Sequence, residues 1–111
     1  MMRILFSFLV FLNLSPAAFA ASGLPRIVSL NLCADPYLMA FADKTQIAAL
    51  THLSRDPDFS AYAEAAQAFP ISDGQIESLI DLKPDIVIVS RWSNAMRNEL
   101  IEQLGLSYGL D

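Results

Sequence analysis

The chain is poor in the residues that build disulfide frameworks, metal centres and nucleic-acid surfaces. Its 111 residues include one cysteine and one histidine, and seven Lys or Arg against twelve Asp or Glu. One cysteine cannot form an internal disulfide, and one histidine alone makes no metal site. A net charge of −5 disfavours nucleic acids and anionic membranes as partners. We therefore expect no nucleic-acid partner and no metal ion or other cofactor.

Motifs of several enzyme classes are also missing. Residues 29–35, which follow the first predicted strand, hold no glycine, so they cannot form a Gly-rich phosphate loop. The chain has no Gly-x-Ser-x-Gly elbow for a nucleophilic serine. Nucleotide-binding and hydrolase functions are therefore disfavoured.

The first twenty residues are typical of a secretory signal peptide. Arg3 gives a short positive start, residues 4–14 are almost wholly apolar, and Ala18 and Ala20 are the small residues that a signal peptidase reads. The apolar run is shorter than the ~20 residues of a membrane helix, although an uncleaved anchor is the alternative. We expect cleavage after Ala20 and one exported domain over residues 21–111, with six Lys or Arg against twelve Asp or Glu.

Strand and helix patterns alternate along this domain. Strands are expected at residues 26–30, 46–51 and 86–89, with Ile71 in a further short one, and a weak last strand at 106–110. Helices are expected after Asp35-Pro36, over 61–69, from a capping box at Ser72 and Gln75 as far as Lys83-Pro84, and after Ser93. The alternation predicts the α/β class, with a parallel sheet flanked by helices on both faces.

Several residues have the chemistry of helix ends. Expected N-terminal caps are Asp35, Asp58 or Ser60, the pair Ser72 and Gln75 in a capping box, and Ser93; Gly105 is the expected C-terminal cap. Inward faces are expected at Ile76, Leu79 and Ile80 and at Leu100, Ile101 and Leu104. The unbroken apolar run over residues 86–89 is typical of a central parallel strand that is covered on both faces.

Ligands of open parallel sheets bind outside the carboxyl ends of the strands. Three expected loops follow such ends, and they carry the candidate ligand-binding residues Asn31, Cys33, His52, Arg91 and Trp92. An indole can stack on a flat ligand and a guanidinium can hold carboxylates. The alternatives are that Trp92 packs on the adjacent helix and that His52 is a solvated loop residue.

The lone thiol allows three interpretations. We expect Cys33 to be buried, which is the usual state of an unpaired thiol in an exported protein. Lipidation there is disfavoured, because the residues before it are Asn31 and Leu32 instead of small ones. The third interpretation is a small exported enzyme that uses Cys33 as nucleophile and His52 as base, for which no orienting third group is apparent.

Three segments resemble the N-terminal lobe of a periplasmic substrate-binding protein. They are RIVSLNLCADPYLMAFAD, IAALTHLSRDP and GQIESLIDLKPDIVIVSRWSNAMRNELIEQLGL, and together they cover about residues 26–106. The family is the two-lobed one with a helical backbone, which serves ABC importers of cobalamin, haem and ferric siderophores. The most specific part is Glu77, five residues, and then Lys83-Pro84-Asp85 before the apolar strand.

The resemblance implies a periplasmic protein with a Rossmann-like lobe that binds a metal chelate and delivers it to an ABC permease in the inner membrane. It also implies a protein that is not an enzyme. Glu77 matches a surface glutamate that docks into permease arginines; from the residues alone it is a first-turn carboxylate that suits the helix dipole. His52 lies near, and Ser90 at, positions where the cobalamin-binding member has aromatic ligand contacts, and Trp92 is two residues further on.

The resemblance also departs from the family at its end. Residues 107–110 match the usual apolar strand poorly, and the sequence contains no bridging helix or second lobe. We expect a lobe that binds its ligand weakly by itself, because half of the contact area is missing. A fragment without function is the remaining alternative.

Overall fold

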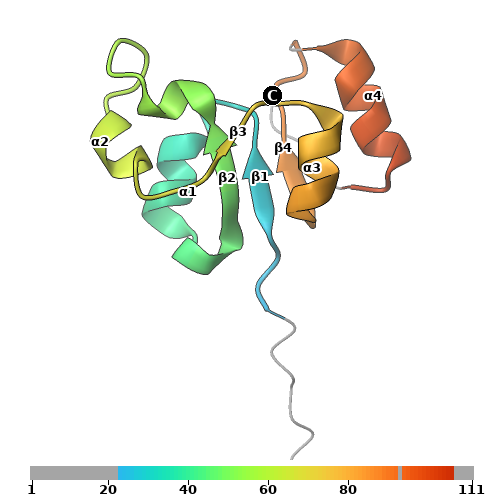
Figure 1. Ribbon diagram of the computed structural model, residues 1–111, viewed down its shortest axis with the longest axis horizontal. Helices are drawn as coiled ribbons and strands as arrows, with labels where there is room; N and C mark the ends of the chain where they lie inside the picture. Colours follow the sequence, from blue (N-terminus) through green and yellow to red (C-terminus); the bar gives the residue numbers. More distant parts are fainter. Residues whose placement is uncertain (1–22, 93, 107–111) are drawn as a thin grey trace, which may run out of the picture.

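Four parallel strands form the centre of the fold in the computed structural model, which describes residues 23–92 and 94–106 (Figure 1). The strands are β1 (Ile27–Ser29), β2 (Ile47–Thr51), β3 (Ile71–Ser72) and β4 (Ile86–Ile88). They lie in the order β3-β2-β1-β4, and every pairing is parallel. The predicted parallel α/β arrangement is therefore confirmed, while the expected signal peptide over residues 1–20 lies outside the described residues.

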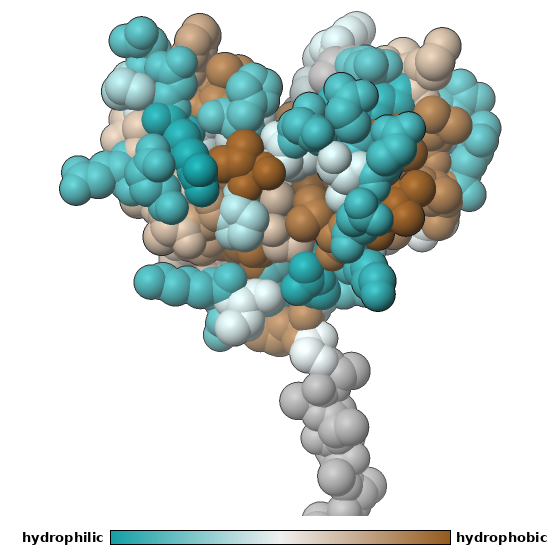
Figure 2. All heavy atoms as spheres, viewed as in Figure 1, coloured by the Kyte–Doolittle hydropathy of each residue, from teal (hydrophilic) through white to brown (hydrophobic). Residues whose placement is uncertain are grey.

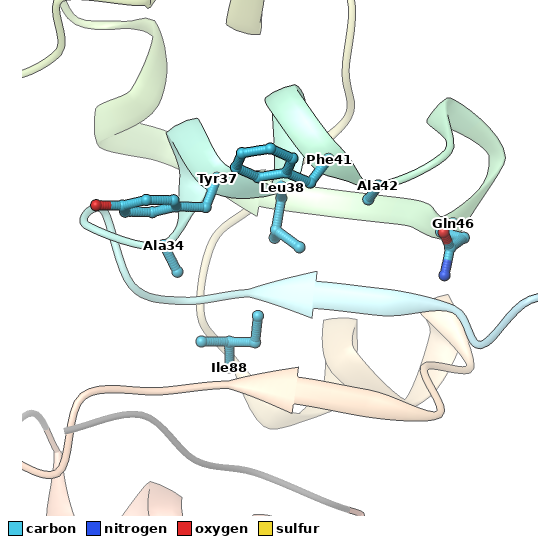
Figure 3. A pocket seen from close by; sticks show the side chains of 7 residues that line it. All are labelled: Ala34, Tyr37, Leu38, Phe41, Ala42, Gln46 and Ile88. Atoms are coloured by element: carbon cyan, nitrogen blue, oxygen red, sulfur yellow. The ribbon is translucent and has the colours of Figure 1, made fainter.

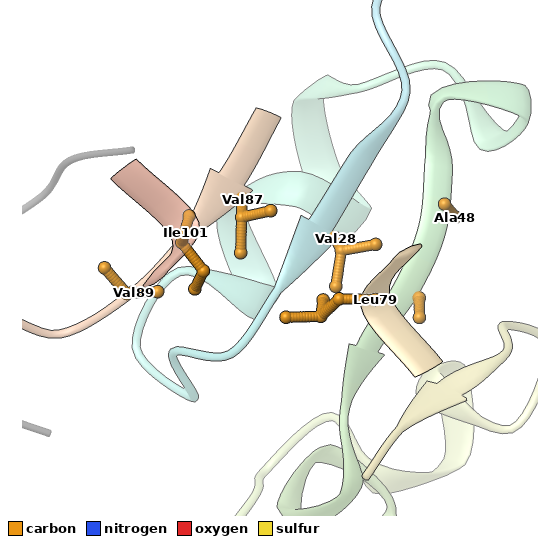
Figure 4. Close-up of a cluster of buried hydrophobic side chains, with 7 residues drawn as sticks. Val28, Ala48, Leu79, Val87, Val89 and Ile101 are labelled. Carbon is orange, nitrogen blue, oxygen red and sulfur yellow. The ribbon is translucent and has the colours of Figure 1, made fainter. Parts of the chain in front are cut away.

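Helices cover the two faces of this sheet in pairs. They are α1 (Asp35–Phe41), α2 (Ala63–Ala66), α3 (Ile76–Leu82) and α4 (Ala95–Gln103), with short 3-10 turns η1 (Lys44–Gln46) and η2 (His52–Arg55). Residues of α3 and α4 pack with Val28 and Val87 in one buried cluster (Figure 4). Residues of α1 and α2 pack with Leu50 in a second cluster. The core is thus divided between the two faces.

The strand β4 occupies a different place from the one its sequence predicts. It pairs with β1 alone among the described strands, so it lies at the edge of the sheet that residues 23–92 and 94–106 form, and the inner strands of that sheet are β1 and β2. The apolar run nevertheless has packing on both faces, because Val87 and Val89 are buried in the α3–α4 cluster and Ile88 lies half-buried on the α1 side. An unbroken apolar run indicates that both faces of the strand are covered by other residues. A strand at the edge of a sheet can also be covered on both faces.

The inward faces of α3 and α4 are narrower than expected. Leu79 is completely buried, but 53% of Ile80 is exposed. The inward stripe of α3 instead runs through Ile76, Leu79 and Leu82 at a spacing of three residues. In α4, Ile101 is buried while Leu100 and Leu104 are exposed. The predictions for Ile80, Leu100 and Leu104 are wrong, because a short helix on one face of a sheet buries only a narrow stripe.

Several predicted helix starts are also wrong. The helix α2 begins only at Ala63 after Tyr62 and has no side-chain cap, so neither Asp58 nor Ser60 caps it. Ser72 belongs to β3, and α3 begins after Gln75 without a side-chain cap. The described cap of α4 is Asn94, whose Oδ1 accepts from the Arg97 amide at 3.0 Å. The expected cap Ser93 lies outside the described residues.

Gly105 ends α4 as predicted. Its φ of +72° lies in the left-handed region, where glycine avoids the strain of a Cβ atom. The Gly105 amide donates to the Glu102 carbonyl at 2.9 Å, and the Leu106 amide donates to the Ile101 carbonyl at 3.3 Å. These bonds satisfy carbonyls at the helix end. Of the weak last strand, residues 107–110 lie outside the described residues.

The segment Lys83-Pro84-Asp85 connects α3 to β4 and forms hydrogen bonds with Arg26, the residue before β1. Lys83 adopts a left-handed conformation with a φ of 49°, which ends the helix. The Asp85 carboxylate accepts from the Arg26 amide at 2.7 Å, and the Asp85 amide donates to the Arg26 carbonyl at 2.8 Å. The Arg26 guanidinium donates to the Leu82 carbonyl at 3.0 Å. The segment therefore places β4 in register with β1.

Replacing Leu79 and Ile80 separately by alanine tests the orientation of α3. Leu79→Ala should lower the free energy of unfolding by about 3 kcal/mol, because it leaves a cavity in the core. Ile80→Ala, the matched control on the next residue, should cost less than about 1 kcal/mol, because its side chain is already half exposed. Urea titrations followed by circular dichroism measure both, and equal losses would contradict this orientation.

Candidate functional site

The candidate ligand-binding residues follow the carboxyl ends of three neighbouring strands. His52 follows β2, Asn31 and Cys33 follow β1, and Arg91 and Trp92 follow β4. Because the strands are parallel and adjacent in the order β2-β1-β4, all three loops leave the sheet on the same side, at the carboxyl ends of the strands (Figure 1). We call this line of strand ends the carboxyl edge. The topology therefore brings the predicted loops to a common edge, as expected from the general rule for open sheets.

The loop after β1 is held by its own polar groups. The Asn31 Oδ1 atom accepts from the Cys33 amide at 2.9 Å, and the Asn31 carbonyl accepts from the Ala34 amide at 3.0 Å. Ala34 is buried beneath the loop, whereas Cys33 is exposed. The prediction of a buried thiol is therefore wrong. The tight turn points Ala34 inward, and the thiol one residue earlier is left at the surface.

The other candidate side chains are open to solvent. His52 begins η2 and is exposed, and the described residues give its imidazole no hydrogen-bond partner. Arg91 is also exposed. The Trp92 side chain is 89% exposed, so the alternative in which the indole packs on α4 is wrong. An indole that is this exposed, in the loop after β4, can stack on a flat partner.

A buried carboxylate lies beneath the loops after β1 and β2, and the sequence did not predict it. Asp35 is the first residue of α1 and is 1% exposed. Its Oδ2 atom accepts from the Thr51 amide at 3.2 Å and from the Ser54 hydroxyl. Its Oδ1 atom is buried and has no partner among the described residues. The expected N-cap role of Asp35 is wrong. Its carboxylate accepts hydrogen bonds from Thr51 and Ser54, and it does not cap α1.

A buried amide supports the loop after β4 in a similar way. Asn98 of α4 is 8% exposed, and its Nδ2 atom donates to the Ser90 carbonyl at 3.0 Å. Ser90 comes directly before Arg91, so this bond fixes the backbone from which the guanidinium and the indole extend. Asp35 of α1 therefore holds the turn after β2, and Asn98 of α4 holds the loop after β4. Sequence patterns do not reveal either contact.

An open cavity of about 370 Å³ lies away from the candidate residues, between α1 and the sheet (Figure 3). It is mostly apolar and is lined by Ala34, Tyr37, Leu38, Phe41, Ala42, Gln46 and Ile88. None of the predicted ligand-binding residues lines it. The space-filling view shows instead a notch in the upper rim, between the side that carries α2 and the side that carries α4 (Figure 2).

The described residues form no recognisable metal centre or membrane span. Within 23–92 and 94–106, no three His, Cys, Asp or Glu side chains group closely enough to hold a metal ion. In the same part of the chain, no helix combines the length and the apolar character needed to cross a bilayer. Comparison with protein-family models, curated proteins and solved structures finds no match to this chain. The resemblance to substrate-binding proteins thus depends on the residues quoted above.

Burial gives Asp35 a predictable effect on stability. Burial raises the pKa of the Asp35 carboxyl above its ordinary value of 3.8, against smaller opposing effects of the nearby Ser29 hydroxyl and of the hydrogen bonds from the Ser54 hydroxyl and the Thr51 amide. Above pH 3.8 the unfolded chain therefore ionises before the folded one, so the contribution of Asp35 to stability falls until pH passes the folded pKa. The contribution is fully present below the unfolded pKa.

Asp35→Asn should remove this dependence. The free energy of unfolding of the natural chain, minus that of the variant, should fall as pH rises from 3.8 towards neutrality. The pKa values of Asp43 and Asp73 are lowered, chiefly by the amides of Thr45 and Gln75, and stability from these groups is lost as pH falls. Both groups occur in both proteins, so they cancel. A difference that is flat or rising across urea titrations at several pH values would contradict the expectation.

Proposed function

We propose that the chain is the N-terminal lobe of a periplasmic substrate-binding protein of an ABC importer. In this proposal it binds a metal chelate (a corrinoid, haem or a ferric siderophore), delivers it to a permease in the inner membrane and catalyses no reaction. The observation that carries the proposal is the exposed Trp92 at the carboxyl edge of a parallel sheet. That edge is where open α/β sheets bind ligands.

The side chains at this edge suit a large, flat and partly anionic ligand. Trp92 offers an aromatic face, while Arg91 and His52 offer hydrogen-bond donors on either side of the loop after β1. Tetrapyrroles and corrinoids combine a broad ring with carboxylate or amide groups at its rim. Aromatic stacking with peripheral polar contacts therefore matches this ligand class better than it matches a compact sugar or an amino acid.

The position of Glu77 supports the docking part of the proposal. Glu77 is exposed in the first turn of α3, and the chain enters α3 directly from the carboxyl end of β3 (Figure 1). The carboxylate therefore lies on the side of the sheet from which the ligand loops project. A permease whose arginines engaged Glu77 would face the ligand-binding edge, as delivery requires. A charge-assisted pair with arginine is among the stronger polar contacts available to an exposed carboxylate.

Ligand binding can be measured through Trp92, which is the only tryptophan in the chain. Cyanocobalamin, haemin or a ferric hydroxamate should quench its emission saturably, because stacking brings an absorbing ring next to the indole. N-acetyltryptophanamide, titrated in parallel, corrects for absorption by the probe. Trp92→Ala should weaken binding at least about tenfold by calorimetry. The ligand part of the proposal is wrong if all three probes follow the free tryptophan control.

Docking can be tested with two carboxylates on the same helix. Glu77→Ala should reduce cellular uptake of the transported chelate, because the permease loses an ionic contact. Asp81→Ala is the matched control, since Asp81 is exposed one turn later on α3. Uptake with Asp81→Ala should stay near that of the natural protein. The first-turn role of Glu77 is worth only about 0.3–1 kcal/mol, so its variant should remain folded. Equal uptake by both variants would remove the docking role.

A thiol enzyme is the second candidate, and the exposure of Cys33 favours it. Cys33 and His52 are both exposed, and they follow the paired strands β1 and β2. The pH profile of Cys33 alkylation distinguishes the two functions. A catalytic thiol next to a base keeps reacting with iodoacetamide at pH 6 and slows in His52→Ala. A profile that is unchanged in His52→Ala argues against the enzyme.

A further inference from the structure

The carboxylate of Asp35 joins two loops that are distant in sequence. Asp35 follows the loop after β1 directly, while its two hydrogen-bond donors come from the end of β2 and from η2. The Thr51 amide lies 16 residues further along the chain and the Ser54 hydroxyl 19 residues further along. One oxygen atom, Oδ2, receives both bonds. The loop that carries Asn31 and Cys33 is thereby linked to the turn that carries His52.

The burial of this link makes it stiff. Asp35 and Ser54 are 1% and 0% exposed, and Thr51 is also buried, so water cannot easily replace either bond. A buried polar group that loses its partner keeps its full desolvation cost, which disfavours opening of the link. Cys33 and His52, in the two loops that this link joins, are exposed. The two loops should therefore hold a fixed distance from one another rather than move independently.

We propose that Asp35 is a positioning residue that fixes the loop after β1 and the turn after β2 relative to each other, so that Asn31, Cys33 and His52 present one preformed surface to the ligand. This inference rests on the proposed function. It assigns Asp35 no direct ligand contact, because the carboxylate is buried beneath the surface. Preforming the surface lowers the ordering cost of binding, which is the general advantage of a rigid site.

The chain offers a matched control in Asp43. This carboxylate also accepts from a backbone amide and a hydroxyl, those of Thr45, at 2.9 and 2.8 Å. It precedes η1, which leads into the amino end of β2, so it lies at the opposite edge of the sheet. Asp43→Ala removes the same kinds of hydrogen bond without touching the candidate ligand loops.

Amide hydrogen exchange measured by mass spectrometry and NMR tests the link in the full chain. Asp35→Ala should accelerate exchange about tenfold or more at the Thr51 amide and in residues 31–34 and 52–55, while β4 and its pairing with β1 keep their protection. Asp35→Asn retains one oxygen acceptor, so it should restore much of the protection at Thr51. If Asp35→Ala fails to fold, Ser54→Ala removes one of the two donors and should accelerate the same segments by a smaller factor. Asp43→Ala should leave these segments unchanged.

Binding of cyanocobalamin and haemin to the same variants supplies the second measurement. Asp35→Ala or Ser54→Ala should raise the Kd of whichever probe the natural chain binds, by about tenfold for a loss of roughly 1.4 kcal/mol. Asp43→Ala should leave that Kd unchanged. Unchanged exchange in the two loops, or acceleration spread equally over all strands, overturns the positioning role. If neither probe binds the natural chain, the ligand proposal fails for these probes, and hydrogen exchange alone decides whether Asp35 links the loops.

Discussion

The parallel pairing of β1 with a strand on each side is the constraint on which the rest of the structure depends. Val28 pairs with Ala49 of β2 and with Val87 of β4. Three segments that are far apart in sequence therefore lie side by side in the sheet. Parallel strands cannot be joined by tight turns, and each connection must cross a face of the sheet. The same requirement that creates the two helical layers therefore brings the loops after β1, β2 and β4 to a common edge.

That edge is built with buried polar groups, because loops at a sheet end leave backbone donors and acceptors without ladder partners. Asp35 receives the Thr51 amide, and Asn98 donates to the Ser90 carbonyl. At the opposite edge, Arg26 and Asp85 exchange backbone and side-chain bonds that set the start of β4. Long-range polar contacts thus fix the ends of strands whose middles are held by apolar packing.

Much of the fold follows from local sequence chemistry. The β-branched residues of β1 and β4 predicted strands, and Gly105 predicted the end of α4. The alternation of strand and helix patterns predicted the parallel α/β class. The periodicity of α3 and α4 was less informative, since Leu79 and Ile80 fit the same template but only Leu79 reaches the core. A pattern of apolar residues limits which faces can be buried, whereas the sheet that a helix meets decides how wide the buried stripe is.

The candidate site shows the same limit more sharply. Its loops could be predicted, because the strands before them have strong patterns. Asp35 could not, because its sequence context of Asp before Pro is also that of a helix cap. The competing partners, Thr51 and Ser54, become neighbours only after β1 and β2 have paired. The exposure of Cys33 likewise depends on a tight turn that hides Ala34.

Under the proposed function, the stretch from Glu77 to Trp92 joins docking and binding in one crossover. The helix α3 begins at the carboxyl edge, descends along the sheet, and reverses at Lys83 so that β4 returns to the same edge. The first turn of α3 and the end of β4 therefore lie on the same side of the sheet. A partner that bound the exposed carboxylate would meet the exposed indole without any rearrangement of the lobe. In this proposal, the ligand would leave the lobe from the same side on which the permease docks.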